Sequence, residues 1–121
     1  MLQNITLSEN LKELLRTVQR RPQATAVLRG SAAYPKIYGN VFFFQTPQGV
    51  LVVADVTGLP APEGACAQPV FGFHIHEGAQ CAGDAEDPFA QAQGHYNPDN
   101  CPHPFHAGDL PPLFSNNGYA F

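Results

Sequence analysis

The sequence of 121 residues contains no tryptophan and few charged side chains. Lysine and arginine together number six against ten acidic residues, so the formal net charge is −4. A chain this poor in cations lacks the basic surface that binds nucleic acids or anionic membranes. It also lacks an apolar stretch approaching the roughly 20 residues of a membrane-spanning helix. We therefore expect neither a nucleic-acid partner nor a membrane partner.

The beginning of the sequence lacks the pattern of a secretory signal. Met1 to Glu9 contain no basic segment followed by an apolar core. We therefore expect a cytoplasmic protein, unless a leader was removed. The chain has only three cysteines, Cys66, Cys81 and Cys101. Because this number is odd, at least one thiol is expected to be free, bound to a metal or paired outside this chain.

What the sequence has in abundance is glycine and proline, with 11 and 12 residues. Many turns and few charges favour an all-β domain with long loops, and the length fits one domain. The β-rich runs predict strands at 24–31, 37–45, 50–57 and 70–76. A turn at 46–49 is expected to join the second and third of them in a hairpin.

One helix is expected before the β region, from residue 8 to residue 20. Ser8 is a favourable N-cap, and Pro22 prevents the helix from continuing. The apolar positions have helical spacing: Leu11, Leu14, Leu15 and Val18. We expect residues 1–22 to form an N-terminal helical extension and residues 23–121 to form the main domain. The helix would serve as a cap on that domain or as a dimer contact.

Residues 77–117 are predicted to be nearly strandless, since glycine, proline, aspartate and asparagine dominate them. A loop of this length inside a compact domain needs something to organise it. A bound metal is a suitable organiser, because ligation free energy offsets the entropy of ordering the chain. Residues 117–121 look like a turn that leads into a further strand.

All five histidines lie between residues 74 and 106, and an aspartate follows them. His74 and His76 are two apart on an expected strand, so their imidazoles share a face. The loop then supplies four donors that suit a closed tetrahedral zinc site: His95, His103, His106 and Asp109. Any one of these loop histidines, taken singly, is better explained as a solvated or hydrogen-bonded side chain. The whole set is not, and it predicts metal binding.

Three motifs around these histidines resemble those of the copper/zinc superoxide dismutase family. The segment 72–77, GFHIHE, resembles the first family signature. The segment 94–98, GHYNP, resembles the family's G-x-H-[FY]-N-P, although Gln93 stands where the leading glycine would be. His103 and the segment 106–110, HAGDL, resemble the zinc loop. The motifs occur in the family order, and the resemblance covers about residues 24–121.

The resemblance implies a Greek-key β-barrel or sandwich of the superoxide dismutase type. We expect this barrel to be incomplete at the C-terminus, because the last strands of the family have no counterpart in these residues. An open barrel exposes strand edges and apolar surface. We therefore expect a homodimer or higher oligomer in which a second copy covers the open edge.

The resemblance also implies two metal cofactors, copper and zinc. Copper would be held by His74, His76 and His95, which would be the catalytic residues. Zinc would be held by His95, His103, His106 and Asp109, so that His95 bridges the metals. Superoxide would be the substrate and would be converted to dioxygen and hydrogen peroxide. Cys81 lies in the loop where the family places one half of an intrasubunit disulfide.

The sequence departs from the family in three ways. No histidine follows His106 to supply a fourth copper ligand, no arginine follows Arg29 to guide superoxide, and no cysteine follows Cys101 to pair with Cys81. Dismutation is therefore expected to be impaired, whether the chain is a fragment or is naturally short. The alternative is a non-catalytic zinc-binding protein of the same family type. A purely structural zinc domain ranks last.

The remaining cysteines have no role that the resemblance implies. Cys101 lies between two expected zinc ligands, so it could replace a ligand or pair with Cys66 or Cys81. Otherwise both would be ordinary small buried residues, which is the interpretation that we prefer for Cys66.

Overall fold

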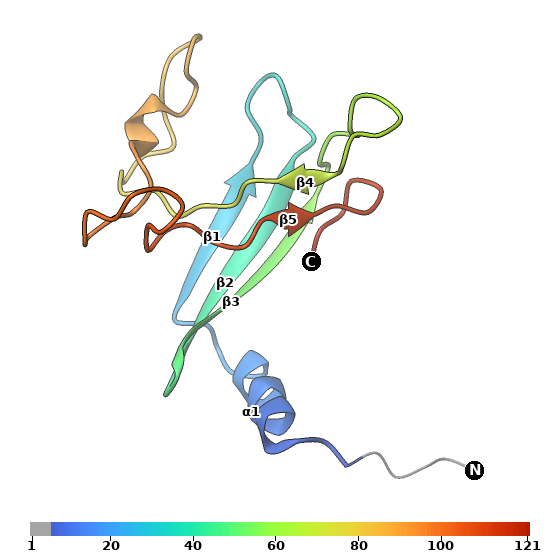
Figure 1. Cartoon of the computed structure of the whole chain (residues 1–121), viewed down its shortest axis with the longest axis vertical. Coiled ribbons are helices and arrows are strands. Elements are labelled where there is room, and N and C mark those ends of the chain that lie inside the picture. The colour runs from blue at the N-terminus through green and yellow to red at the C-terminus, as the bar shows by residue number, and fades with distance from the viewer. Residues whose placement is uncertain (1–5) are drawn as a thin grey trace.

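The computed structural model describes residues 6–121. The first five residues of the expected extension 1–22, and most of the segment that lacks a signal pattern, lie outside the described residues. Seven elements follow in order: α1 (Glu9–Val18), β1 (Ala24–Arg29), β2 (Tyr38–Thr46), β3 (Gly49–Thr57), β4 (Val70–Phe71), the 3-10 helix η1 (Ala90–Ala92) and β5 (Leu113–Phe114). Figure 1 shows α1 at one end of a sheet, with the long loops at the other end.

Three antiparallel strands form the main sheet in the order β1-β2-β3. They occupy the first three runs that the sequence predicts, and β2 and β3 form the expected hairpin. In its turn, the Thr46 hydroxyl donates to the Gly49 carbonyl at 3.0 Å and accepts from the Gln48 N–H at 3.2 Å. Gly49 has a φ of 140°, a conformation that a residue without Cβ adopts readily.

The core lies against one face of this sheet. Val56, Leu59 and Ala120 are its buried centre, and Leu28, Ile37, Ala54, Phe71 and Leu113 pack around them. The end of the chain returns to the sheet here, because Val56 and Ala120 exchange two backbone hydrogen bonds of 2.9 Å. The strand expected after the turn at residue 117 is therefore present as an isolated β-bridge.

The predicted strand 70–76 is wrong beyond Phe71. Only Val70–Phe71 forms a strand, β4, and it pairs with β5 inside the region that was expected to be nearly strandless. His74 and His76 instead form isolated bridges with Asp109 and His95. Each bridge joins a different loop segment, so no continuous strand partner exists along these residues.

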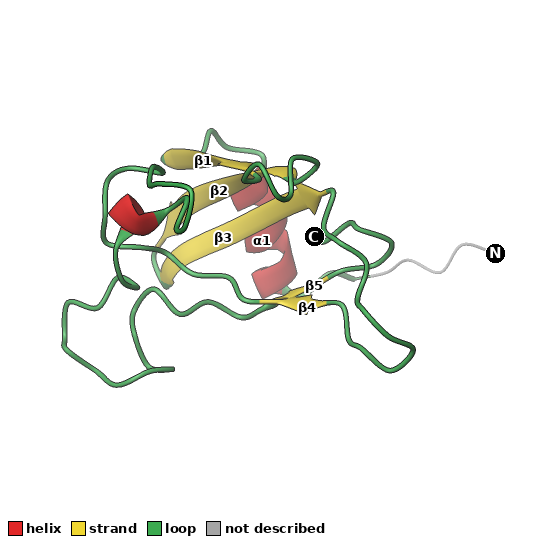
Figure 2. Ribbon diagram, turned by 90° about the horizontal axis from the view of Figure 1, so that it is seen from above, coloured by secondary structure: helices red, strands yellow, loops and turns green. Residues whose placement is uncertain are grey.

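The two sheets do not close into a barrel within residues 6–121. Figure 2 shows the β4–β5 ribbon on one side of the three-stranded sheet, connected to it by long loops. This arrangement agrees with an all-β fold whose barrel is incomplete.

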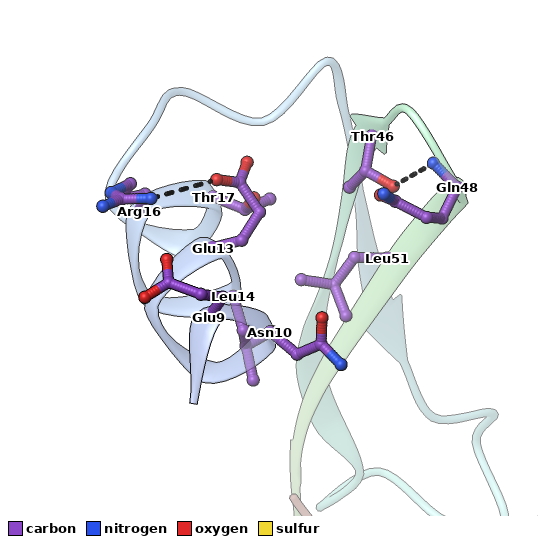
Figure 3. A pocket seen from close by; sticks show the side chains of 9 residues that line it. All are labelled: Glu9, Asn10, Glu13, Leu14, Arg16, Thr17, Thr46, Gln48 and Leu51. Carbon is purple, nitrogen blue, oxygen red and sulfur yellow. Dashed lines mark hydrogen bonds and ion pairs between the residues drawn. The ribbon is translucent and has the colours of Figure 1, made fainter. Parts of the chain in front are cut away.

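Helix α1 begins where the sequence predicts and ends two residues early. The Ser8 side chain accepts a hydrogen bond from the Leu11 N–H at 3.2 Å, and the last helical residue is Val18. Only Thr17 is buried, while the leucines of the apolar stripe are about 40% exposed. A hollow of about 550 Å³ separates part of the helix from the β2–β3 hairpin (Figure 3).

Among the described residues, no helix has the length and apolarity to cross a membrane.

We expect Val56→Ala to lower the free energy of unfolding by about 2 kcal/mol, because it removes buried methyl groups from the centre of the core. Val56 is 1% exposed. Val50→Ala is the matched control on the same strand, since Val50 is 55% exposed. Urea denaturation measures both. Equal losses from the two variants would contradict this description of the core.

Candidate metal centre

Three chain segments meet through a small network of backbone hydrogen bonds at the end of the main sheet. The Ile75 N–H donates to the Gly108 carbonyl at 2.9 Å, and the Tyr96 N–H donates to the Ile75 carbonyl at 2.8 Å. The Gly108 N–H completes the triangle by donating to the Tyr96 carbonyl at 2.8 Å. Because these three residues are neighbours of the histidines and Asp109, the network brings the predicted ligands into one region.

Gly108 is the residue that allows the segments to approach this closely. A Cβ atom at this position would lie 2.3 Å from the Ile75 carbonyl oxygen and 2.9 Å from the Tyr96 nitrogen. Both neighbours are backbone atoms that already bond to each other, so neither can move without breaking the network. The glycine of the motif HAGDL is therefore required by packing, next to the aspartate that it positions.

Four side chains form the first group of potential ligands, which we call the four-residue cluster: His95, His103, His106 and Asp109. Nδ1 of His103 and Nδ1 of His106 each lie 3.3 Å from Oδ2 of Asp109. Nδ1 of His106 lies 3.4 Å from Nδ1 of His95. Ligands at about 2.0 Å from zinc in a tetrahedron are separated by about 3.3 Å. Three nitrogens and one carboxylate at these separations fit zinc.

Asp109 is the most enclosed member of this cluster, and its side chain is 8% exposed. Its Oδ2 accepts the His106 backbone N–H at 3.1 Å, and its Oδ1 lies 2.7 Å from Nδ1 of His95. Burial acts to raise the pKa of this carboxyl. The hydrogen bonds from His106 and His95, together with the charges of His106 and His103, outweigh burial and hold the pKa below its ordinary value. The carboxylate is therefore charged and available to a cation.

A second group, the three-histidine cluster, consists of His74, His76 and His95. The rings of His74 and His95 stack with their centroids 3.9 Å apart. Burial lowers the pKa of His74, and the nearby His95 lowers it further. Both effects favour the neutral imidazole, which is the form that binds a metal.

His95 belongs to both clusters. Its Nδ1 faces Asp109 at 2.7 Å and His106 at 3.4 Å, so this nitrogen serves the four-residue cluster. The other ring nitrogen, Nε2, is then the one left for the three-histidine cluster. His95 is the residue that the two clusters share, as a bridge between two metals requires.

Sequence reasoning missed one contact of this centre. Nδ1 of His76 lies 2.8 Å from the backbone carbonyl of Gln93. The sequence signal was present, because Gln93 replaces a motif glycine, but a backbone contact cannot be read from residue types.

The three-histidine cluster borders a groove of about 450 Å³ between the main sheet and the β4–β5 ribbon. Apolar side chains such as Val56, Phe71 and Phe73 line most of it, together with His74 and His76. Arg29 also lines this groove, which gives it one cation.

The cysteines play no part in either cluster of the described residues. All three are free, and Cys66 and Cys81 are exposed. The prediction that Cys66 is buried is wrong, since Cys66 lies in the proline- and glycine-rich loop between β3 and β4 rather than on a core strand. Cys101 is half-buried and neither replaces a ligand nor forms a disulfide. Its backbone N–H and carbonyl bond the Asn97 side chain at 3.0 and 2.9 Å, which closes the loop between two histidines.

Two comparisons with known proteins point to one family. Residues 37–121 match the model of the copper/zinc superoxide dismutase family. The Cu-Zn superoxide dismutase of Legionella pneumophila is 39% identical over 103 residues, which cover 79% of this chain and 57% of the relative. No solved structure matches significantly.

The chain therefore belongs to the copper/zinc superoxide dismutase family. It spans a little over half the length of the Legionella relative. Membership of this family implies copper and zinc as cofactors, and the two clusters contain the side chains that could hold them.

We expect Asp109→Ala to lower zinc affinity and to loosen residues 77–117, because it removes the only carboxylate of the four-residue cluster. Zinc content after dialysis and the rate of limited proteolysis measure the two effects. Asp99→Ala is the control, since Asp99 is an exposed acid of the same loop. Unchanged zinc content and protease resistance in Asp109→Ala would refute the assignment of this ligand.

Proposed function

We propose that the four-residue cluster binds zinc, that the three-histidine cluster binds copper, and that His95 is a ligand of both metals. The observation that carries this proposal is the position of His95, whose Nδ1 faces Asp109 and His106 while its ring stacks on His74. The donor types support the same division. Three imidazoles suit copper, and three imidazoles with a carboxylate suit zinc.

We further propose that the reaction is superoxide dismutation. When bound, copper supplies one-electron redox chemistry, by which one superoxide is oxidised to dioxygen and a second, with two protons, is reduced to hydrogen peroxide. His74, His76 and His95 would hold copper through three imidazoles, a set that would leave a coordination position for a small anion. Without metal, the hydrogen bond between Asp109 and Nδ1 of His95 orients that ring; zinc would replace this hydrogen bond, because both atoms would become its ligands.

Residues 1–121 supply three copper ligands rather than four, because all five histidines already belong to the two clusters. The groove contains Arg29, but no arginine follows it in the sequence. We therefore propose that dismutation by these residues is impaired. The alternative is a zinc-binding protein of this family without redox turnover. The cytoplasmic location expected from the sequence stays a prediction.

Metal analysis separates these two functions. After incubation with both metals and removal of excess, we expect about one copper and one zinc per chain, measured by elemental analysis. His74→Ala should lose copper and keep zinc, whereas His103→Ala should lose zinc first, since each histidine belongs to one cluster only. Zinc alone in the unmodified chain would contradict the dismutase proposal and support the alternative.

We also propose that the protein is a homodimer or higher oligomer. Apolar side chains remain exposed on the described chain, among them Phe114 at 71% and Phe121 at 81%. Exposed apolar surface and unpaired strand edges favour association. Sedimentation velocity at micromolar concentration is expected to give at least a dimer. A single monomeric species would contradict this prediction.

A further inference from the structure

Gln93 has a backbone conformation that almost only glycine adopts. Its φ is 62° and its ψ is −155°. A side chain in this region is strained by contact with its own backbone. Two other residues that are not glycine have a positive φ within residues 6–121, Asn100 and Asn117. Asparagine tolerates positive φ better than most residues, so Gln93 is the exception.

Hydrogen bonds on both sides hold Gln93 in this conformation. The Gly78 N–H donates to the Ala92 carbonyl at 2.8 Å, and the Glu77 N–H donates to the Gly94 carbonyl at 3.0 Å. The neighbours of Gln93 are thus fixed to the segment that carries His76. Strain of this kind persists where the surrounding structure over-determines the backbone, and such positions gather at functional sites.

The strained peptide directs its carbonyl at His76. The oxygen lies 2.8 Å from Nδ1, a distance at which Nδ1–H donates a hydrogen bond. A neutral imidazole carries one proton, so a proton on Nδ1 leaves the lone pair on Nε2. A backbone carbonyl therefore selects which nitrogen of His76 is free to bind a metal.

We propose that Gln93 is a positioning residue for His76: its strained backbone fixes the His76 tautomer whose Nε2 is free for the three-histidine cluster. This inference rests on the proposed function only in naming His76 as a copper ligand. The Gln93 side chain is exposed. The role accordingly belongs to the backbone, and glycine should perform it without strain.

The test measures the His76 tautomer by long-range ¹H–¹⁵N NMR in the metal-free chain, at alkaline pH where imidazoles are neutral. In the unmodified chain and in Gln93→Gly, His76 should carry its proton on Nδ1. Gln93→Gly should also raise Tm by about 4–8 °C, because it relieves strain. Gln93→Val, a β-branched residue that strongly resists positive φ, should mix the tautomers and weaken Cu(II) binding by about 10- to 100-fold.

Asn117→Val is the matched control. It also places valine at a positive φ, so it should lower Tm, but it should leave the His76 tautomer unchanged. The proposal is overturned by a proton on Nε2 of His76 in the unmodified chain, by an unchanged tautomer in a folded Gln93→Val, or by a Gln93→Gly variant with no rise in Tm. If Gln93→Val does not fold, the unmodified chain and Gln93→Gly decide the question.

These results are independent of the proposed function, because they need neither copper nor superoxide. A fixed tautomer in a chain that binds no copper would contradict the dismutase and leave the positioning role standing. A mixed tautomer in a chain that binds both metals would contradict the positioning role and leave the dismutase proposal standing.

Discussion

The carboxylate of Asp109 is the group on which the arrangement of the long loop depends. It lies within 3.3 Å of nitrogens from three histidines and also accepts a backbone N–H. A hydrogen bond to a charged group contributes about 1.5–3 kcal/mol. Structural zinc contributes about 10 kcal/mol or more. A metal on these donors thus contributes more than any one hydrogen bond to ordering a segment that has little regular structure of its own.

The main sheet and the metal centre have different sources of stability. Strands β1, β2 and β3 are held by a continuous ladder and by the apolar core around Val56. The centre is held by single bridges between short segments, joined at Gly108. The sheet supplies a rigid base, while the centre depends on a few contacts whose geometry admits little substitution. The strained peptide at Gln93 belongs to this second, more constrained part.

Much of the fold was predictable, because local rules decide it. The N-cap at Ser8 and the leucine spacing predicted the helix, and the β-rich runs separated by turns predicted three strands. The prediction of the fourth strand is wrong beyond Phe71, because His74 and His76 pair with two separate loop segments rather than with one neighbouring strand. The prediction that Cys66 is buried is wrong for a similar reason, since residue type does not determine whether other parts of the chain cover a loop.

The sequence by itself determined the family and the six candidate ligands, because metals require particular side chains and the motifs preserve their order. The family resemblance also predicted how these ligands divide between copper and zinc, but the sequence could not determine the distances and contacts that assemble the two clusters. That geometry depends on which ring nitrogen of His95 faces Asp109, and on the backbone triangle at Gly108 that brings distant segments together. Contacts made by backbone atoms, such as the one between the Gln93 carbonyl and Nδ1 of His76, do not depend on the side-chain type and cannot be read from the sequence. Only the tertiary structure decides them.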